Sequence, residues 1–192
     1  IVYGDSNRPV ELPSNFYIIA TMNTSDHNVF TLDTAFQRRW RMSMIENDLS
    51  RLDETFANHP ILDTTVTWKQ FNSTINALIL EANTRMSSSE DKRLGTHFVS
   101  PMELEYDANE DSETATPEQK KLAADQNSRF AEKVLKYLWD DAFKFNPEAL
   151  FDTDNVESLE QVIRIFVYNK GQDRFKIFKQ TVRDALHHAQ QQ

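Results

Sequence analysis

The sequence predicts an α/β segment followed by a bundle of helices, and two patterns carry this prediction. Residues 16–22 (FYIIATM) form a continuous apolar run, which is typical of a strand buried on both faces of a mostly parallel sheet. From residue 47 onward the apolar residues recur at intervals of three and four, which is the period of an α-helix. We therefore assign residues 1–46 to the end of an α/β domain and residues 47–192 to a helical domain.

Within residues 1–46 the expected order is strand, loop, helix, strand. Pro13 and Asn15 mark the start of the first strand, and a polar stretch follows it. Residues 32–39 have helix-forming content with Asp33 near their beginning, and residues 41–45 are expected to form a short second strand. This order is that of an α/β domain.

Four segments of the second domain each place apolar residues on one face of a helix. The four sets are Trp68, Phe71, Ile75, Leu78, Ile79, Ala82 and Met86; Phe130, Val134, Leu135, Leu138, Trp139, Ala142 and Phe143; Leu159, Val162, Ile163, Phe166 and Val167; and Phe175, Phe178, Val182 and Leu186. Between the first two, residues 103–117 carry six acidic and no basic side chains. We expect this stretch to be an exposed, mobile insertion loop because its charges repel one another.

The amino-acid composition argues against several classes of function for this chain. The net charge of −9, from 30 acidic and 21 basic residues, argues against a broad surface for nucleic acid or anionic lipid. The absence of cysteine excludes disulfides and thiolate sites and fits a reducing compartment, so we expect a cytoplasmic protein. The sequence has neither a membrane-length apolar run nor a signal-peptide pattern, and it opens without an initiator Met, so we expect a fragment of a longer chain.

The first candidate site follows the expected strand. In open α/β sheets, ligands bind beyond the carboxyl ends of the strands, and Asn23 would lie there. A neutral amide can orient a water molecule or a phosphate oxygen by donating and accepting hydrogen bonds. Thr24, Ser25 and Asp26 could do related work. The alternative is that these are ordinary turn and cap residues, and composition alone favours that alternative.

A second candidate site is the run FQRRWR at residues 36–41. Its three arginines lie near the end of the expected helix, where guanidinium groups can reach a phosphate and stabilise charge that develops during its transfer. The alternative is a solvated helix end that interacts favourably with the helix dipole.

Residues 15–40 (NFYIIATMNTSDHNVFTLDTAFQRRW) resemble a block of the McrB-type branch of the AAA+ nucleotide-driven motors. That block reads roughly N-x-Y-I-I-x-T-M-N-T-A-D-R-S and then D-x-A-L-R-R-R-F. Residues 92–98 (KRLGTHF) resemble the segment R-I-G-H-S-Y-F of the family's helical lid. The resemblance implies the C-terminal part of an AAA+ P-loop nucleotide domain, from the sensor-1 strand through the helical lid.

The resemblance also implies residue roles. Asn23 matches the sensor-1 asparagine, which reads the γ-phosphate and helps to place the attacking water, and Asp26 matches the aspartate of the same motif. Arg38 and Arg39 match the last two arginines of the family's triplet, which reach the nucleotide of a neighbouring subunit as arginine fingers do. Arg93 matches the lid arginine in a nucleotide-contacting, sensor-2 position. The resemblance implies no protein metal ligand in this stretch.

The chain departs from the family at several positions of the first block. His27 and Asn28 stand where the family usually has Arg and Ser, Gln37 replaces the first arginine of the triplet, and Trp40 replaces Phe. The changes at 37 and 40 spare Arg38 and Arg39. No contact made through position 27 is carried over to this chain.

Two family elements are missing from the sequence. A phosphate-binding loop, G-x-x-x-x-G-K-[ST], needs closely spaced glycines, whereas the chain has only Gly4, Gly95 and Gly171. It also lacks an apolar strand that ends in Asp-Glu to hold magnesium. Both elements lie upstream in the family's order, so we expect the main ligands of ATP or GTP and Mg²⁺ there and predict that this chain alone is inactive.

By resemblance, the chain is therefore part of a nucleotide-hydrolysing motor subunit of a McrBC-like DNA restriction system. The implied partners are neighbouring copies in a ring, usually a hexamer, and a nuclease subunit, with DNA bound through other domains and no membrane. One alternative is a non-catalytic assembly module that keeps only the ring interface and the lid. Another is a nucleic-acid binder that uses Arg38, Arg39 and Arg41 around Trp40, against which the acidic balance argues.

Overall fold

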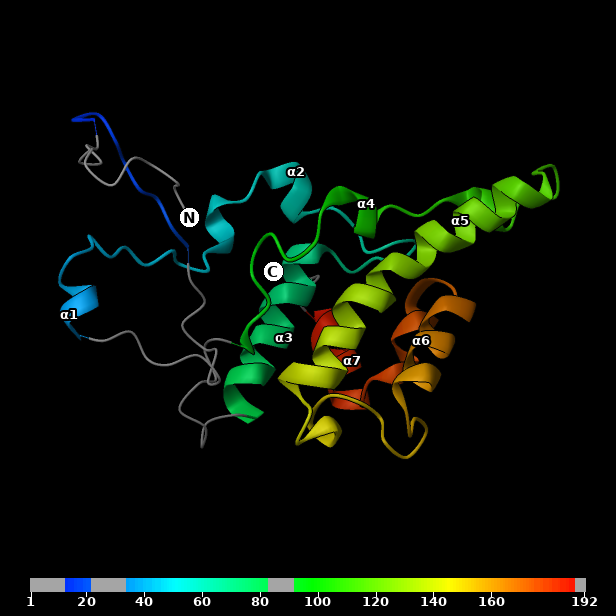
Figure 1. Ribbon diagram of the computed structural model, residues 1–192. Coiled ribbons are helices and arrows are strands. Elements are labelled where there is room, and N and C mark those ends of the chain that lie inside the picture. Colours follow the sequence, from blue (N-terminus) through cyan, green and yellow to red (C-terminus); the bar gives the residue numbers. More distant parts are fainter. Residues whose placement is uncertain (1–12, 22–33, 83–91, 189–192) are drawn as a thin grey trace, which may run out of the picture.

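The computed structural model describes residues 13–21, 34–82 and 92–188, and all of its regular elements there are helical (Figure 1). The α-helices are α1 (Thr34–Gln37), α2 (Glu54–Ala57), α3 (Trp68–Ala82), α4 (Pro101–Leu104), α5 (Pro117–Phe130), α6 (Leu159–Tyr168) and α7 (Gln180–His188). The 3₁₀ turns are η1 (Leu49–Arg51), η3 (Ala108–Glu110), η6 (Pro147–Ala149) and η7 (Gly171–Ile177). Two π-helical segments, η4 (Ala131–Leu135) and η5 (Leu138–Ala142), continue the line of α5.

The α/β prediction is wrong. The described ranges contain no strand, and their only β pairing consists of isolated bridges between Pro60 and Thr67 and between Phe151 and Phe178. The described part of the apolar run expected to be a buried strand, residues 16–21, is exposed, since 51% of Phe16 and 93% of Ile19 are accessible. A strand buried on both faces needs neighbouring strands to take up its backbone hydrogen bonds. None pairs with residues 16–21 in the part of the chain that the structure describes, and apolar content alone cannot supply one.

The second expected strand also fails. Residues 41–45 adopt no regular element, and the side chains of Met44 and Ile45 are exposed. Of the helix expected over residues 32–39, the described residues 34–39 form only the single turn of α1. Residues 13–21 and 34–46 therefore lie outside the packed part of the molecule.

The longest helical element begins where its sequence dictates. Thr116 accepts a hydrogen bond from the backbone N–H of Gln119, whose side chain accepts one from the N–H of Thr116. Pro117 occupies the first helical position, where its missing N–H costs nothing. The element ends in the wide turn of η5, where the N–H of Phe143 donates to the Leu138 carbonyl at 2.9 Å.

The core forms where α3, η4, α6, η7 and α7 meet, and it is rich in phenylalanine. Its central rings are Phe71, Phe130, Phe166, Phe175 and Phe178, all essentially buried. Phe71 contacts Phe130 edge to face with ring centroids 5.4 Å apart, and Phe130 stacks on Phe166 at 5.5 Å. Such pairs add roughly 0.5–1.5 kcal/mol each beyond the area that they bury.

Helical periodicity located this core well. Most residues of the four predicted apolar faces that lie in described ranges are buried, and of the rest all but Leu159 pack partly against the core. The fourth helix begins later than predicted, because Phe175 belongs to η7 and Phe178 precedes α7. Both rings are nevertheless buried, since a 3₁₀ turn places side chains three residues apart on one side.

The acidic stretch at residues 103–117 is more regular than an open loop. It includes the end of α4 and the turn η3, and Leu104 is fully buried. Two lysines from other segments neutralise part of its charge: Lys133 lies 2.9 Å from Glu103, and Lys170 lies 3.2 Å from Glu110. Because these lysines are distant in sequence, repulsion among the acidic side chains of this stretch did not predict its regular structure.

Candidate functional site

Two of the predicted site residues, Asn23 and Asp26, lie in residues 22–33, outside the described residues, as does His27. Their roles stay predictions. The structure does describe Arg38, Arg39 and Arg93, so the geometry of the candidate site is built from these three.

Arg38 and Arg39 lie on residues 34–46, which we call the arginine arm. Both side chains are exposed and directly follow α1, where their N–H groups donate to the carbonyls of Thr34 and Phe36 at 3.1 and 3.0 Å. Figure 1 shows α1 standing apart from α3, α5, α6 and α7. The arm thus presents two guanidinium groups to the surroundings of the molecule rather than to its own core.

Arg93 lies on residues 92–96, which we call the Arg93 loop, and the backbone of this loop is held by side chains. Tyr137 donates to the Lys92 carbonyl at 3.0 Å, and the indole N–H of Trp68 donates to the Thr96 carbonyl at 2.9 Å. Between them Leu94 is fully buried in the core. Arg93 is half-buried beside this anchor.

The peptide groups of Leu94 receive most of these contacts. Asn76 accepts the Leu94 N–H at 2.7 Å through Oδ1 and donates to the Leu94 carbonyl at 3.0 Å through Nδ2. Asn47 donates to the same carbonyl at 2.9 Å. Asn72 donates to the carbonyls of Leu94 and Gly95, both at 3.3 Å. Three amide side chains from two separate segments therefore converge on one peptide unit.

The cluster is assembled largely by α3. Asn72 and Asn76 are four residues apart, so both project from the same side of the helix as the buried Trp68. The Asn76 amide also donates to Asn72 Oδ1 at 2.8 Å, which fixes the orientation of both side chains. Sequence reasoning missed these residues, although two asparagines bordering an otherwise apolar helix face were a detectable signal.

Asn47 connects the two candidate regions. It directly follows the arginine arm, and its Nδ2 bond to the Leu94 carbonyl attaches the end of the arm to the Arg93 loop. Its Oδ1 is buried without a hydrogen-bond partner within the described ranges. The structure thus links the arm and the loop through one side chain, while Arg38 and Arg39 remain on the exposed part of the arm.

Lys92, the first residue of the Arg93 loop, contacts a different part of the molecule, the end of η5. Its ammonium donates to the Asp141 carbonyl at 3.0 Å and lies 5.9 Å from the centre of the Phe145 ring. The cation therefore interacts with the C-terminal end of η5, where carbonyl groups lack helical partners. Through Lys92 and Tyr137, the Arg93 loop is fixed to the long helical element as well as to α3.

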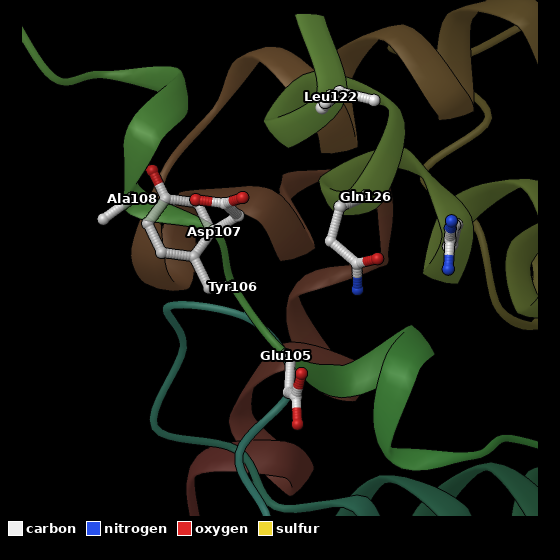
Figure 2. Close-up of a pocket in the computed structure, with 7 residues that line it drawn as sticks. Glu105, Tyr106, Asp107, Ala108, Leu122 and Gln126 are labelled. Atoms are coloured by element: carbon white, nitrogen blue, oxygen red, sulfur yellow. The ribbon is translucent and has the colours of Figure 1, made fainter. Parts of the chain in front are cut away.

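A surface depression of the described part of the chain lies elsewhere. It measures about 480 Å³ and lies between α5 and residues 105–108, and its lining comprises Glu105, Tyr106, Asp107, Ala108, Leu122, Gln126 and Arg129 (Figure 2). None of the predicted site residues lines it. Its walls are held together locally, since Asn127 accepts the Asp107 N–H at 2.8 Å and donates to the Asp107 carbonyl at 3.0 Å.

A charged cluster lies next to this depression. The Lys170 ammonium contacts Tyr106 at 3.1 Å and Asp111 at 3.0 Å, and Tyr106 donates to Asp111. Burial acts to lower the pKa of Lys170, but its bonds to Tyr106, Asp111 and Glu110 outweigh burial and raise it. Burial and the Asp111 carboxylate raise the pKa of Tyr106. Lys170 therefore stays protonated at neutral pH, and the contacts of the cluster join η3 to the end of α6.

The described ranges contain no group of three or more His, Cys, Asp or Glu side chains arranged to hold a metal ion. The same ranges contain no helix long and apolar enough to cross a membrane.

The chain is 32% identical over 151 residues to a protein of Bacillus subtilis (strain 168) described as type II restriction enzyme BsuMI component YdiS. It is similar to a restriction-enzyme component. The match covers 75% of this chain but 36% of the relative, so the chain spans little more than a third of that protein's length. No protein-family model and no solved structure matches the chain.

Proposed function

We propose that this chain is part of a DNA restriction system, as a segment of a larger component. The observation that carries this proposal is the similarity to the Bacillus subtilis restriction component over three quarters of the chain. In finer detail, we propose a McrB-type AAA+ nucleoside triphosphatase subunit that uses ATP or GTP with Mg²⁺. The resemblance of residues 15–40 and 92–98 to that family supports this finer statement.

The exposure of the arginine arm is consistent with a role in trans. An arginine finger must leave its own subunit and reach a phosphate that a neighbour holds. Arg38 and Arg39 are exposed, and the apolar residues on either side of them are uncovered too. We therefore assign the arm to an interface between neighbouring copies in a ring, with the helical part as the lid.

The test uses the full parent protein and complementation between two inactive variants. Arg38→Ala subunits are mixed with subunits inactivated in the upstream phosphate-binding loop, and phosphate release is followed. Each variant alone should be nearly inactive, whereas mixing should restore turnover because each intact finger can then serve an intact neighbouring site. Arg41→Ala, on the same arm but beyond the triplet, is the matched control and should hydrolyse normally.

A second function is favoured by a specific observation. Apolar side chains of Phe16, Ile19, Met44 and Ile45 are exposed on both described parts of the region before residue 47. Such surface suits a non-catalytic assembly module that binds partners without hydrolysis. If the wild-type parent assembles but releases no phosphate, this second function replaces the first. If mixed assemblies form and the wild type hydrolyses, yet mixing restores nothing, the finger assignment fails.

A further inference from the structure

We propose that Asn76 is a positioning residue for Arg93. In this proposal the asparagine cluster around Leu94 holds the Arg93 loop so that the guanidinium meets a phosphate group of the bound nucleotide. The inference rests on the proposed nucleotide hydrolysis. What is new is the role of Asn76. Together with Asn72 and Asn47, it attaches the Arg93 loop to the helical body and so determines the position of Arg93.

The hydrogen bonds around Leu94 involve buried amide groups, whose burial costs free energy. Buried amide groups lose their hydration and are tolerated only when they are hydrogen-bonded. Asn72 is fully buried, and Asn76 is half-buried beside it. Anchoring the loop by burial alone needs no amide, because Leu94 is already fully buried in the core. Burial alone does not fix the orientation of the peptide groups on both sides of Leu94, whereas hydrogen bonds from the amide side chains do.

Asn76 holds both backbone groups of the residue that follows Arg93. Asn76 binds both the N–H and the carbonyl of Leu94, at 2.7 and 3.0 Å, so it imitates the pairing of a neighbouring strand. Fixing these two groups restricts the backbone torsions that orient the adjoining residue. Arg93 is that residue, and Tyr137 holds the carbonyl immediately before it at 3.0 Å. The backbone of Arg93 is therefore fixed on both sides by side chains from α3 and from the long helical element.

Three asparagine side chains converge on a single carbonyl group. Asn76, Asn47 and Asn72 all donate to the Leu94 oxygen, at 3.0, 2.9 and 3.3 Å. Because Asn47 adjoins the arginine arm, a shift of the arm changes a bond to the same peptide group that Asn76 holds. Asn76 thus keeps the Arg93 loop in place when the arm moves.

The chain offers a matched control for Asn76. Asn127 binds both backbone groups of Asp107, at 2.8 and 3.0 Å, in the same two-bond arrangement. It belongs to α5 and holds the segment that lines the surface depression, not the Arg93 loop. Loss of either amide removes comparable contacts, so a difference between the two variants in turnover cannot be explained by lost stability alone.

The experiment measures nucleotide hydrolysis by the full parent protein in Asn76→Ala, Arg93→Ala and the double variant. We expect Asn76→Ala to lower kcat/KM by between about tenfold and a hundredfold, as for a misplaced catalytic contact. In the Arg93→Ala background the same change should have no further effect, because Asn76 acts only through Arg93. Asn127→Ala should stay within about twofold of the wild type.

Two results would overturn the proposal while leaving the proposed function intact. One is that the wild type hydrolyses nucleotide and the Arg93→Ala variant is equally active. The other is a loss from Asn76→Ala that is equally large with and without Arg93. A parent protein that hydrolyses nothing would instead overturn the proposed function, and this inference with it. If Asn76→Ala fails to fold, Asn76→Asp replaces it, since it keeps the acceptor for the Leu94 N–H and removes only the donor.

Discussion

Arg174 and Asp63, 111 residues apart in the chain, form an ion pair in which the arginine side chain is completely buried. The guanidinium also donates to the carbonyls of Phe166 and Val167, at 2.8 and 3.3 Å, near the end of α6. Asp63 in turn accepts the Gly171 N–H at 2.9 Å. The pair thus joins the segment before α3 to the α6–η7 corner, and Gly171 adopts a φ of +53° there, which favours glycine.

We predict that Asp63→Ala destabilises the chain by about 3–5 kcal/mol, because it leaves the Arg174 charge buried without its carboxylate. The measurement is the free energy of unfolding from urea titration. Lys176→Ala is the control, since it removes only an exposed ion pair with Asp173. Its cost should stay below about 1 kcal/mol. Equal effects of the two variants would contradict the structural role of the buried pair.

Phe71→Ala should cost about 3–5 kcal/mol, since Phe71 is fully buried and contacts Trp68, Phe130, Phe175 and Phe178. Thermal unfolding followed by circular dichroism measures the loss. Phe145→Ala is the matched control, because 74% of Phe145 is exposed, and it should change stability by less than about 0.5 kcal/mol. A small loss at Phe71 would mean that the phenylalanine cluster is not the centre of the core.

We predict that the Glu103 carboxylate makes the free energy of unfolding depend on pH in the acid range. Burial acts to raise the pKa of Glu103, but hydrogen bonds from Ser100 and Lys133 outweigh burial and lower it from 4.5 to about 2. A carboxyl group whose pKa is lower in the folded state stabilises the protein above its unfolded pKa. That contribution is complete above pH 4.5 and is lost as the pH falls from 4.5 to about 2.

The check is the urea midpoint of wild type and Glu103→Gln between pH 7 and pH 2. The difference between them should be largest near neutral pH and should shrink through the acid window. Glu113→Gln, an exposed carboxylate of the same segment, is the control and should follow the wild type throughout. A gap between wild type and Glu103→Gln that does not change with pH would exclude the charge-dependent account.

Thr116→Ala should destabilise the chain by about 1 kcal/mol, because it removes the hydroxyl that caps the first turn of α5. Thr114→Ala, two residues earlier and exposed, should have little effect. Hydrogen exchange at the N-terminal turn of α5 measures the change locally. Unchanged protection of the Gln119 amide in Thr116→Ala would argue against the cap.

The purified 192-residue chain should release negligible phosphate from ATP or GTP with Mg²⁺. Its sequence contains no G-x-x-x-x-G-K-[ST] pattern and no apolar strand ending in Asp-Glu, so the groups that hold the phosphates and the metal are missing. A phosphate-release assay on the pure chain is sufficient. Steady turnover would overturn the expectation that these ligands lie upstream.

The helical part could be predicted from the sequence because its evidence is local. The face containing Trp68, Phe71 and Ile75 repeats every three or four residues, and α3 buries it as expected. A strand is different, since its stability depends on partners that its own sequence does not contain. The apolar run over residues 16–22 met the composition criterion for a strand, yet no described segment pairs with its described part, residues 16–21.

The contacts around Arg93 could not be predicted for a similar reason. Resemblance indicated Arg93 itself, but Asn76 and Asn47 reach Leu94 across 18 and 47 residues. No periodic pattern encodes which backbone group an amide will meet over such separations. The border position of Asn72 and Asn76 on α3 was the only local sign of a polar contact there.

Among the described residues, none before Leu49 belongs to the hydrophobic core or packs against it. The heat capacity increment of unfolding follows the apolar area that leaves the core, so residues 13–21 and 34–46 should contribute little to it. Substitutions of exposed residues within 34–46 should therefore leave the calorimetric transition nearly unchanged in enthalpy and width.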